Sequence, residues 1–307
     1  MRKYFAALLL ALAALIPMTA SANAAVSVGM GDQSPQLFST PSFQKMKKIK
    51  TVRYIAPWDV ENDPAAKATA DLWIKNARAN GYKVHVTFNY SLLKPEKLPS
   101  VAAYTKATKA FVARHKSDVE VWGVFNEANR GTVKGRFATP GPKLAAQYFV
   151  AFRKSVCKGC KIVGLDVLDG NSIKPTLTYV KSFLKNAKGA KPTIWGFHNY
   201  SDTNRFSTTR TAAFLKVAKG GQVWLTETGG LYRLGNSFKP STSRQAKATT
   251  QVFKIATKYK SRIKRVYFYN FFAPNPIDRP DDIFDAGLID PDGDPRPAYD
   301  ILLAKTK

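Results

Sequence analysis

Short apolar runs rich in β-branched and aromatic residues alternate with longer amphipathic segments along most of the chain. This alternation predicts eight strands, each followed by a helix. The predicted strands are residues 26–31, 51–58, 83–89, 119–127, 161–169, 193–200, 222–230 and 265–272. The predicted helices are residues 42–50, 64–80, 101–115, 142–156, 174–187, 208–218 and 243–260, with a last one beginning near Pro297.

The predicted strands are apolar on both faces, which is typical of a parallel sheet covered by helices. Eight strand–helix units in a chain of this length are what a closed (β/α)8 barrel, the TIM barrel, requires. The alternative is an open doubly wound sheet, which would carry a glycine-rich phosphate loop after an early strand, and no such motif is present. The sequence therefore predicts an α/β fold with one barrel domain over residues 25–307.

The first 24 residues have the pattern of a secretory signal peptide. Arg2 and Lys3 precede an apolar run from about Phe5 to Ile16, and Ala22-Asn23-Ala24 forms a cleavage site. An uncleaved membrane anchor is the alternative, but the apolar run is short for a membrane span. We expect a secreted protein, either extracellular or associated with the cell envelope, that acts as a monomer.

Composition adds two expectations. The two cysteines, Cys157 and Cys160, lie in CKGC between a predicted helix and a strand, where a structural disulfide is favoured over a redox pair that would open a helix. With three histidines, they are too few for a four-ligand zinc site, and we expect neither metal nor cofactor.

The formal charge of +27 indicates a surface that attracts polyanions. The lysines are scattered, and no nucleic-acid-binding motif accompanies them, so specific nucleic-acid binding is not expected. Solvated helix faces and adhesion to an anionic cell-wall polymer both remain open.

Function in a barrel of this kind sits at the carboxyl ends of the strands. Polar and aromatic residues gather at these predicted ends. They are Trp58, Asn89, Tyr90, Asn126, Glu127, Asp166, Asp169, His198, Asn199, Tyr200, Glu227 and Asn270. Trp58 and Tyr90 are candidates either for stacking on sugar rings or for packing in the core.

Glu127 and Glu227 end the fourth and seventh predicted strands, which face each other across a barrel mouth. Two opposed carboxyl groups are the minimal equipment for hydrolysing a glycosidic bond. The alternative is that each glutamate is an ordinary salt-bridged residue at a strand end.

The stretch FNEANRG resembles the Asn-Glu motif that ends strand four in clan A retaining glycoside hydrolases, and WLTETGG resembles their strand-seven nucleophile segment. VRY, HNY and the tail GLIDPDGDPRPAYDIL extend the resemblance along the chain. Within the clan, the sequence resembles small secreted members of glycoside hydrolase families 5, 39 and 128. Phe125 and Ala128 depart from the Trp and Pro usual in that motif. The resemblance implies that Glu127 is the general acid/base, Glu227 the nucleophile, and Asn126 a ligand of the sugar 2-hydroxyl.

The resemblance also places Arg53 beneath Glu227, gives Tyr200 a hydrogen bond to Glu227, and puts His198 near Glu127. Arg53 and Tyr200 would then keep Glu227 ionised, and a drier setting would hold Glu127 protonated. The other residues expected to bind substrate are Trp58, Asn89, Tyr90 and Asn270.

These observations favour a secreted retaining β-glycosidase that hydrolyses a β-linked polysaccharide, with a β-glucan as the first candidate. The alternative is a non-catalytic glycan-binding or cell-wall adhesion barrel with a basic surface.

Overall fold

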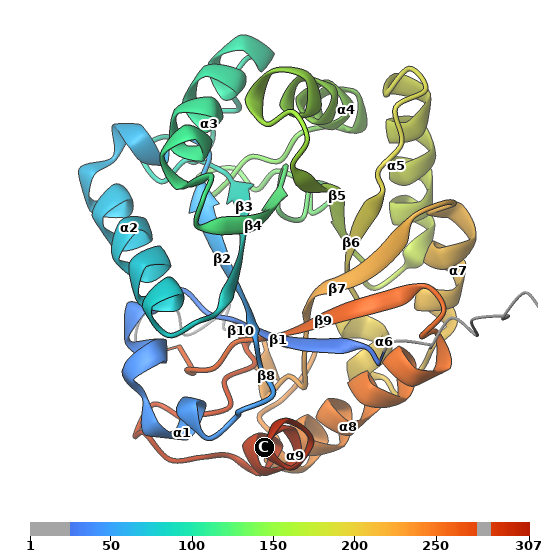
Figure 1. Ribbon diagram of the computed structural model, residues 1–307. Coiled ribbons are helices and arrows are strands. Elements are labelled where there is room, and N and C mark those ends of the chain that lie inside the picture. The colour runs from blue at the N-terminus through green and yellow to red at the C-terminus, as the bar shows by residue number, and fades with distance from the viewer. Residues whose placement is uncertain (1–24, 275–283) are drawn as a thin grey trace, which may run out of the picture.

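Eight parallel strands close into a barrel inside a ring of helices (Figure 1). The computed structural model describes residues 25–274 and 284–307, so the predicted signal peptide lies outside the described residues. The barrel strands are β1 (Ser27–Gly31), β2 (Thr51–Pro57), β3 (Lys83–Asn89), β4 (Val119–Gly123), β5 (Lys161–Leu168), β6 (Ile194–His198), β7 (Gln222–Thr228) and β9 (Ile263–Tyr269). β9 pairs in parallel with β1 and completes the circle, which confirms the predicted (β/α)8 fold.

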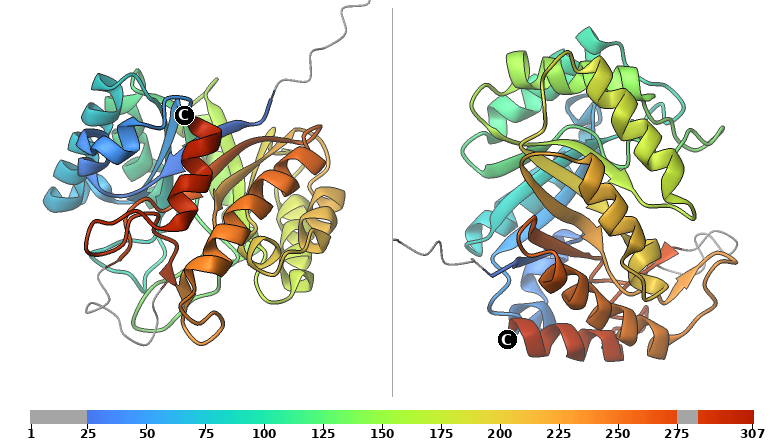
Figure 2. Two further views of the ribbon diagram at one scale, coloured as in Figure 1. Left: turned by 90° about the horizontal axis from the view of Figure 1, so that it is seen from below. Right: turned by 90° about the vertical axis from the view of Figure 1, so that its right-hand side faces the viewer.

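The helices form an outer layer around the strands (Figure 2). They are α1 (Pro41–Gln44), α2 (Pro64–Ala79), α3 (Val101–His115), α4 (Pro142–Ala151), α5 (Ile173–Asn186), α6 (Tyr200–Asn204), α7 (Thr209–Val217), α8 (Thr242–Lys258) and α9 (Pro297–Thr306), with short turns η1 (Pro35–Ser39), η2 (Val60–Asn62) and η3 (Phe152–Val156). Within the described parts of the chain, no helix is long and apolar enough to cross a membrane.

The last helix joins the end of the chain to its beginning. Tyr299 in α9 donates a hydrogen bond to the Ser42 carbonyl in α1, and the backbone N–H of Lys48 donates to the carbonyl of Thr306. Figure 1 shows α9 beside both α1 and α8. The helical ring is thus closed by contacts between segments far apart in sequence.

Two features at the barrel mouth differ from the predicted elements. β4 ends at Gly123 rather than at Glu127, because residues 126–129 form a turn. β6 ends at His198, and the following residues begin the short helix α6. A further two-stranded antiparallel sheet, β8 (Arg233–Leu234) with β10 (Phe284–Asp285), is built from the segments after β7 and β9.

The barrel interior is divided along its axis. The part farther from the carboxyl ends of the strands is filled by an apolar cluster of buried residues from β4, β5, β6, β7 and β9, namely Val121, Val163, Ile194, Trp224 and Tyr267. The part nearer the carboxyl ends of the strands is polar and holds the buried side chains Arg53, Asp166 and His198. Trp73, Phe111 and Trp195 belong to the larger core between strands and helices.

A disulfide joins Cys157 to Cys160 in the turn between η3 and β5. The backbone N–H of Cys160 also donates to the carbonyl of Cys157. The bond closes a tight loop at the end of a helix, as the CKGC spacing predicts.

His85 on β3 is a fully buried histidine whose two ring nitrogens have no hydrogen-bond partner among the described residues. It packs against Trp224 and Tyr267. Burial, followed by the positive charge of Arg53, lowers the pKa of His85 well below its ordinary value.

We expect this histidine to make the protein less stable as pH falls below about 6.5, because the unfolded chain then binds a proton that folded His85 does not. As the pH falls, the free energy of unfolding should decrease less steeply in His85→Leu than in the wild type, by up to about 1.4 kcal/mol per pH unit. Guanidinium unfolding between pH 7 and pH 5 measures both slopes, and equal slopes would contradict the expectation.

Candidate active site

Six of the residues predicted for the site meet at the carboxyl ends of the barrel strands. Arg53 comes from β2, Asn126 and Glu127 from the turn after β4, and His198, Tyr200 and Glu227 from the ends of β6 and β7 and the start of α6. Direct hydrogen bonds or ion pairs join them into one network.

The two glutamates approach each other closely. One carboxylate oxygen of Glu127 and one of Glu227 lie within 4.8 Å of each other and of a His198 ring nitrogen. His198 Nδ1 is 3.0 Å from Glu127 Oε1 and 3.8 Å from Glu227 Oε2. Glu127 keeps 14% of its side-chain surface exposed and Glu227 keeps 8%, so both carboxyl groups can be reached from the mouth.

Arg53 lies beneath this pair and is itself buried. Its Nη1 donates to Glu227 Oε2 at 3.1 Å, and its Nη2 donates to Asn126 Oδ1 at 2.6 Å and to Asp166 Oδ2 at 3.1 Å. The guanidinium therefore fixes Glu227 and Asn126 relative to each other, because its donors are planar and rigidly spaced.

Tyr200 fixes the second oxygen of Glu227. Its hydroxyl donates to Glu227 Oε1 at 3.2 Å. Tyr200 is the first residue of α6, and the Asp169 carboxylate accepts hydrogen bonds from the backbone N–H groups of Ser201 and Asp202 at that helix end. The ring of Phe284 in β10 packs edge-on against Tyr200 from the mouth side.

The turn that carries Glu127 is held by its neighbours on both sides. Glu127 has a φ of 45°, in the left-handed region that non-glycine residues seldom occupy. The Asn126 N–H donates to the Phe88 carbonyl on β3, and the Ala128 N–H donates to the Asp166 carbonyl on β5. These two bonds anchor the turn and aim the Glu127 side chain across the mouth.

Neighbouring charges separate the pKa values of the two glutamates. Burial raises the pKa of both, but for Glu127 the cationic His198 and then Arg130 outweigh burial, so its pKa lies below the ordinary value. For Glu227, burial together with the charges of Glu127 and Asp166 outweighs His198 and Arg53, and its pKa is raised. This order is opposite to the one expected from the sequence, which placed His198 near Glu127 but did not predict that His198 carries a positive charge.

His198 is that cation. Burial would lower its pKa, but the charges of Asp166 and Glu227 and contacts with Asp166 and Glu127 raise it to about 10. At neutral pH the imidazole is therefore protonated, and Nδ1 presents its proton to Glu127.

The remaining predicted residues lie on the same rim but outside this network. Tyr90 stacks on Phe137, Trp58 packs partly against the core, and Asn89 ends β3. The Asn270 side chain donates to the carbonyl of Phe272. Among the described residues, no hydrogen bond or ion pair joins any of the four to either glutamate.

Two charged residues near the glutamates have no predicted role in the sequence. Asp166 stands at a predicted strand end, but nothing in its local pattern shows that its side chain points inward to Arg53 and His198. Arg130, in the turn region after β4, lies 3.5 Å from Glu127 Oε2 and covers the ring of Phe137. Its position three residues after Glu127 is the one feature of the sequence that could have indicated this contact.

The oxygens of Glu127 and Glu227 with a nitrogen of His198 form the group that could hold a cation within residues 25–274 and 284–307. The same atoms are engaged with His198 as a cation and with Arg53 and Tyr200, so two positive charges already face them. The expectation of no metal stays a prediction.

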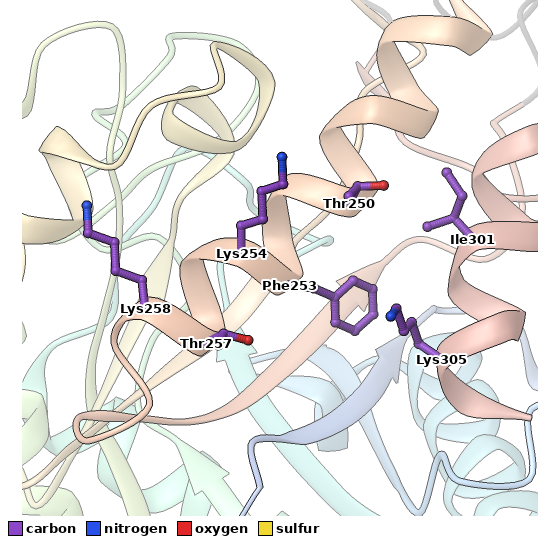
Figure 3. A pocket seen from close by; sticks show the side chains of 7 residues that line it. All are labelled: Thr250, Phe253, Lys254, Thr257, Lys258, Ile301 and Lys305. Carbon is purple, nitrogen blue, oxygen red and sulfur yellow. The ribbon is translucent and has the colours of Figure 1, made fainter.

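A separate hollow of about 490 Å³ lies between α8 and α9 on the outer wall (Figure 3). Figure 3 shows Phe253 on its floor with Lys305 alongside. Its lining residues are Thr250, Phe253, Lys254, Thr257, Lys258, Ile301 and Lys305. It contains no carboxyl group, so it lacks the equipment of the barrel mouth.

Removing the buried guanidinium should be costly, because Asp166 and Glu227 would keep their charges without a partner. We expect Arg53→Met to lower the free energy of unfolding at pH 7 by about 3–5 kcal/mol. Adding Glu227→Gln should restore part of the loss. Denaturant titration measures it, and a cost below about 1 kcal/mol, typical of an exposed ion pair, would disprove this role.

Comparison with known proteins agrees with this geometry. The model of the family "Glycosyl hydrolase catalytic core" matches residues 93–300. A comparison with curated proteins found no match.

Several solved structures share the fold. Xylanase B from Clostridium stercorarium F9 is 16% identical, with a TM-score of 0.66 and 91% of this chain and 96% of that chain covered. Xylanase 10B from Thermotoga maritima is 19% identical, with a TM-score of 0.61 and coverage of 91% and 95%. A GH5_18 variant from Bifidobacterium longum subsp. longum, in complex with Manb1-4GlcNAc, is 14% identical, with a TM-score of 0.65 and coverage of 92% and 78%.

Identities this low show the barrel fold alone. The family match is stronger because it spans more than half of the chain and includes both FNEANRG and WLTETGG. It confirms the resemblance to glycoside hydrolases, and this protein belongs to the glycosyl hydrolase catalytic core family.

Proposed function

We propose that this glycoside hydrolase is a retaining β-glycosidase that cleaves a β-linked polysaccharide by double displacement. One observation carries the proposal. The oxygens of Glu127 and Glu227 lie within 4.8 Å of each other. This spacing fits the roughly 5 Å of a retaining enzyme better than the roughly 6.5–9.5 Å of an inverting one.

In the first step, Glu227 attacks the anomeric carbon while Glu127 gives a proton to the departing glycosidic oxygen. Arg53 and Tyr200 each hold one oxygen of Glu227, which directs the nucleophile. The Asn126 carbonyl oxygen is held by Arg53, and its Nδ2 has no partner among the described residues, which leaves it for the sugar 2-hydroxyl.

In the second step, Glu127 takes a proton from water as that water attacks the glycosyl-enzyme and frees Glu227. Glu127 serves both steps because its pKa follows the charge on Glu227, as expected for two carboxyl groups this close. Two inversions at one carbon retain the β configuration.

A β-glucan is our first candidate substrate. Tyr90, stacked on Phe137, and the partly exposed Trp58 offer aromatic surface on the rim for sugar rings. The neighbours named as xylanases make xylan the natural comparison, and mannan and exopolysaccharides complete the panel.

Substitution of the two glutamates, with azide added, tests the mechanism. Glu227→Ala should lose several orders of magnitude in activity and, with azide, convert a β-glycoside into the α-glycosyl azide. Glu127→Ala should lose about 10²–10⁴-fold on substrates with poor leaving groups and form the β-glycosyl azide. Product configuration is assigned by NMR.

The non-catalytic alternative makes a different prediction. A glycan-binding barrel would bind members of the panel without turnover by the wild type, and either alanine variant would bind equally well. Full activity in Glu227→Ala would refute the nucleophile assignment.

We also propose that the protein is exported by residues 1–24 and that its basic surface binds an anionic wall polymer. The hollow between α8 and α9 supports the proposed binding of a wall polymer. Lys254 and Lys305 flank its apolar floor and form no ion pair with any described carboxylate. A sugar ring could rest on Phe253 while the lysines meet its carboxylates.

Lys254→Ala/Lys305→Ala should elute from immobilised polygalacturonate at lower salt than the wild type. The matched control is Lys181→Ala/Lys185→Ala, which removes the same charge from exposed positions on α5. If the two double variants elute at the same salt, binding is a property of net charge and the hollow has no special role.

A further inference from the structure

Asp166 is almost completely buried at the centre of the polar network, yet neither step of the proposed reaction uses it. We propose that Asp166 is a positioning residue that keeps His198 in its imidazolium form, so that the proton delivered by Glu127 is stored on His198. The inference rests on the proposed function, because it explains where Glu127 obtains its acid proton.

The contacts of Asp166 join the two halves of the site. Oδ2 accepts from Arg53 Nη2 at 3.1 Å, and Oδ1 accepts from the Thr226 hydroxyl at 2.6 Å. Oδ1 also lies 3.1 Å from His198 Nε2, at ion-pair distance but without the alignment of a hydrogen bond. One carboxylate thus touches the cation beneath Glu227 and the cation beside Glu127.

The neighbouring strand leaves space for this carboxylate. Gly196 on β6 faces it, and a Cβ at that position would lie 2.4 Å from Asp166 Oδ1 and 2.8 Å from the Thr226 hydroxyl. Any side chain on residue 196 would therefore displace Asp166 from His198. The glycine and the threonine together fix where the negative charge lies.

The other charged groups around His198 do not replace Asp166. Glu127 and Glu227 contact Nδ1, so they are the groups that receive or share its proton. Arg53, on the β2 side, is a buried cation that opposes a positive imidazole, whereas His85 on β3 is neutral because its pKa is well below the ordinary value. Asp166 is the carboxylate at Nε2 within the described residues, and it balances the charge of Arg53.

The protons balance over the two steps if His198 gives up one proton and later regains it. In the resting site His198 carries the proton on Nδ1, and Glu127 is ionised. The proton passes along the 3.0 Å contact to Glu127 Oε1 and then to the leaving oxygen as the glycosidic bond breaks, which leaves His198 neutral. In the second step Glu127 takes a proton from the attacking water and returns it to His198, so the cycle restores the starting state.

Asp166→Asn tests the inference because it preserves size and removes the charge. The alkaline limb of kcat/KM should move to lower pH by about 1–3 pH units, since the imidazolium loses its main stabilising neighbour. On a β-glycoside with a poor leaving group, kcat/KM at the pH of the wild-type alkaline midpoint should fall at least about fivefold, which is the loss that a one-unit shift gives there. On the dinitrophenyl glycoside, which needs no leaving-group protonation, it should change little.

A second readout does not depend on turnover. The ¹⁵N NMR signals of His198 report its protonation in the free protein, and in Asp166→Asn they should show the imidazolium losing its proton about 1–3 pH units lower than in the wild type. Gly196→Ala, which displaces the same carboxylate by crowding, should shift the titration in the same direction.

Asp32→Asn is the matched control. Asp32 is also a buried carboxylate of the barrel mouth, but it accepts hydrogen bonds from the backbone N–H groups of Phe271 and Phe272 and does not contact His198. It should cost stability without shifting the His198 titration. If Asp166→Asn does the same, or lowers kcat/KM equally for both leaving groups at every pH, the inference is wrong. A wild type that turns over no glycoside would refute the proposed function, while the NMR titration would still decide whether Asp166 holds the proton on His198.

Discussion

A buried positive charge on β2 organises the mouth of this barrel. Arg53 has no exposed side-chain surface, and it meets two carboxylates and an amide from three other elements. A buried guanidinium is stable only when its neighbours supply negative charge and acceptors in the right places. The positions of Glu227, Asp166 and Asn126 are therefore mutually dependent, and the geometry of the chemistry follows from satisfying one cation.

The same constraint explains why the barrel interior is divided. Around Trp224 and Tyr267 the strands are packed by apolar groups, which supply the stability that a polar layer cannot. Above them, charges are brought close enough that each changes the protonation of the next. His198 stays cationic, Glu127 stays ionised, and Glu227 is drawn towards its neutral form. These opposed shifts follow from where the charges of His198, Arg53 and Asp166 lie, and the proton on His198 supplies the acid that ionised Glu127 lacks.

The strands and their order could be predicted from sequence because apolar runs of strand length recur with helical segments between them. The ends were harder: Val124 and Phe125 remain buried after β4, so the pattern continues although the backbone has already turned towards Glu127. The glutamates, Arg53, His198 and Tyr200 were predicted because each has a recognisable motif. Asp166 was not given a role, since inward and outward positions on a strand apolar on both faces have the same local pattern. Which glutamate has the lower pKa could not be predicted, because that order depends on the distance from His198 to Glu127, and only the folded structure sets this distance.

The pairing of β9 with β1 has a consequence for how the site comes into being. Ser27 pairs with Arg265, so the ring closes only when the two ends of the fold meet. Contacts between such distant segments form late, because the entropy of closing a long loop must be overcome first. Arg53 and Glu227 lie on strands that closure brings across the barrel from each other, and the Tyr269 carbonyl that accepts from Tyr200 belongs to the closing strand itself. A chain still being synthesised therefore has no nucleophile in place, and hydrolytic competence arrives together with the completed circle.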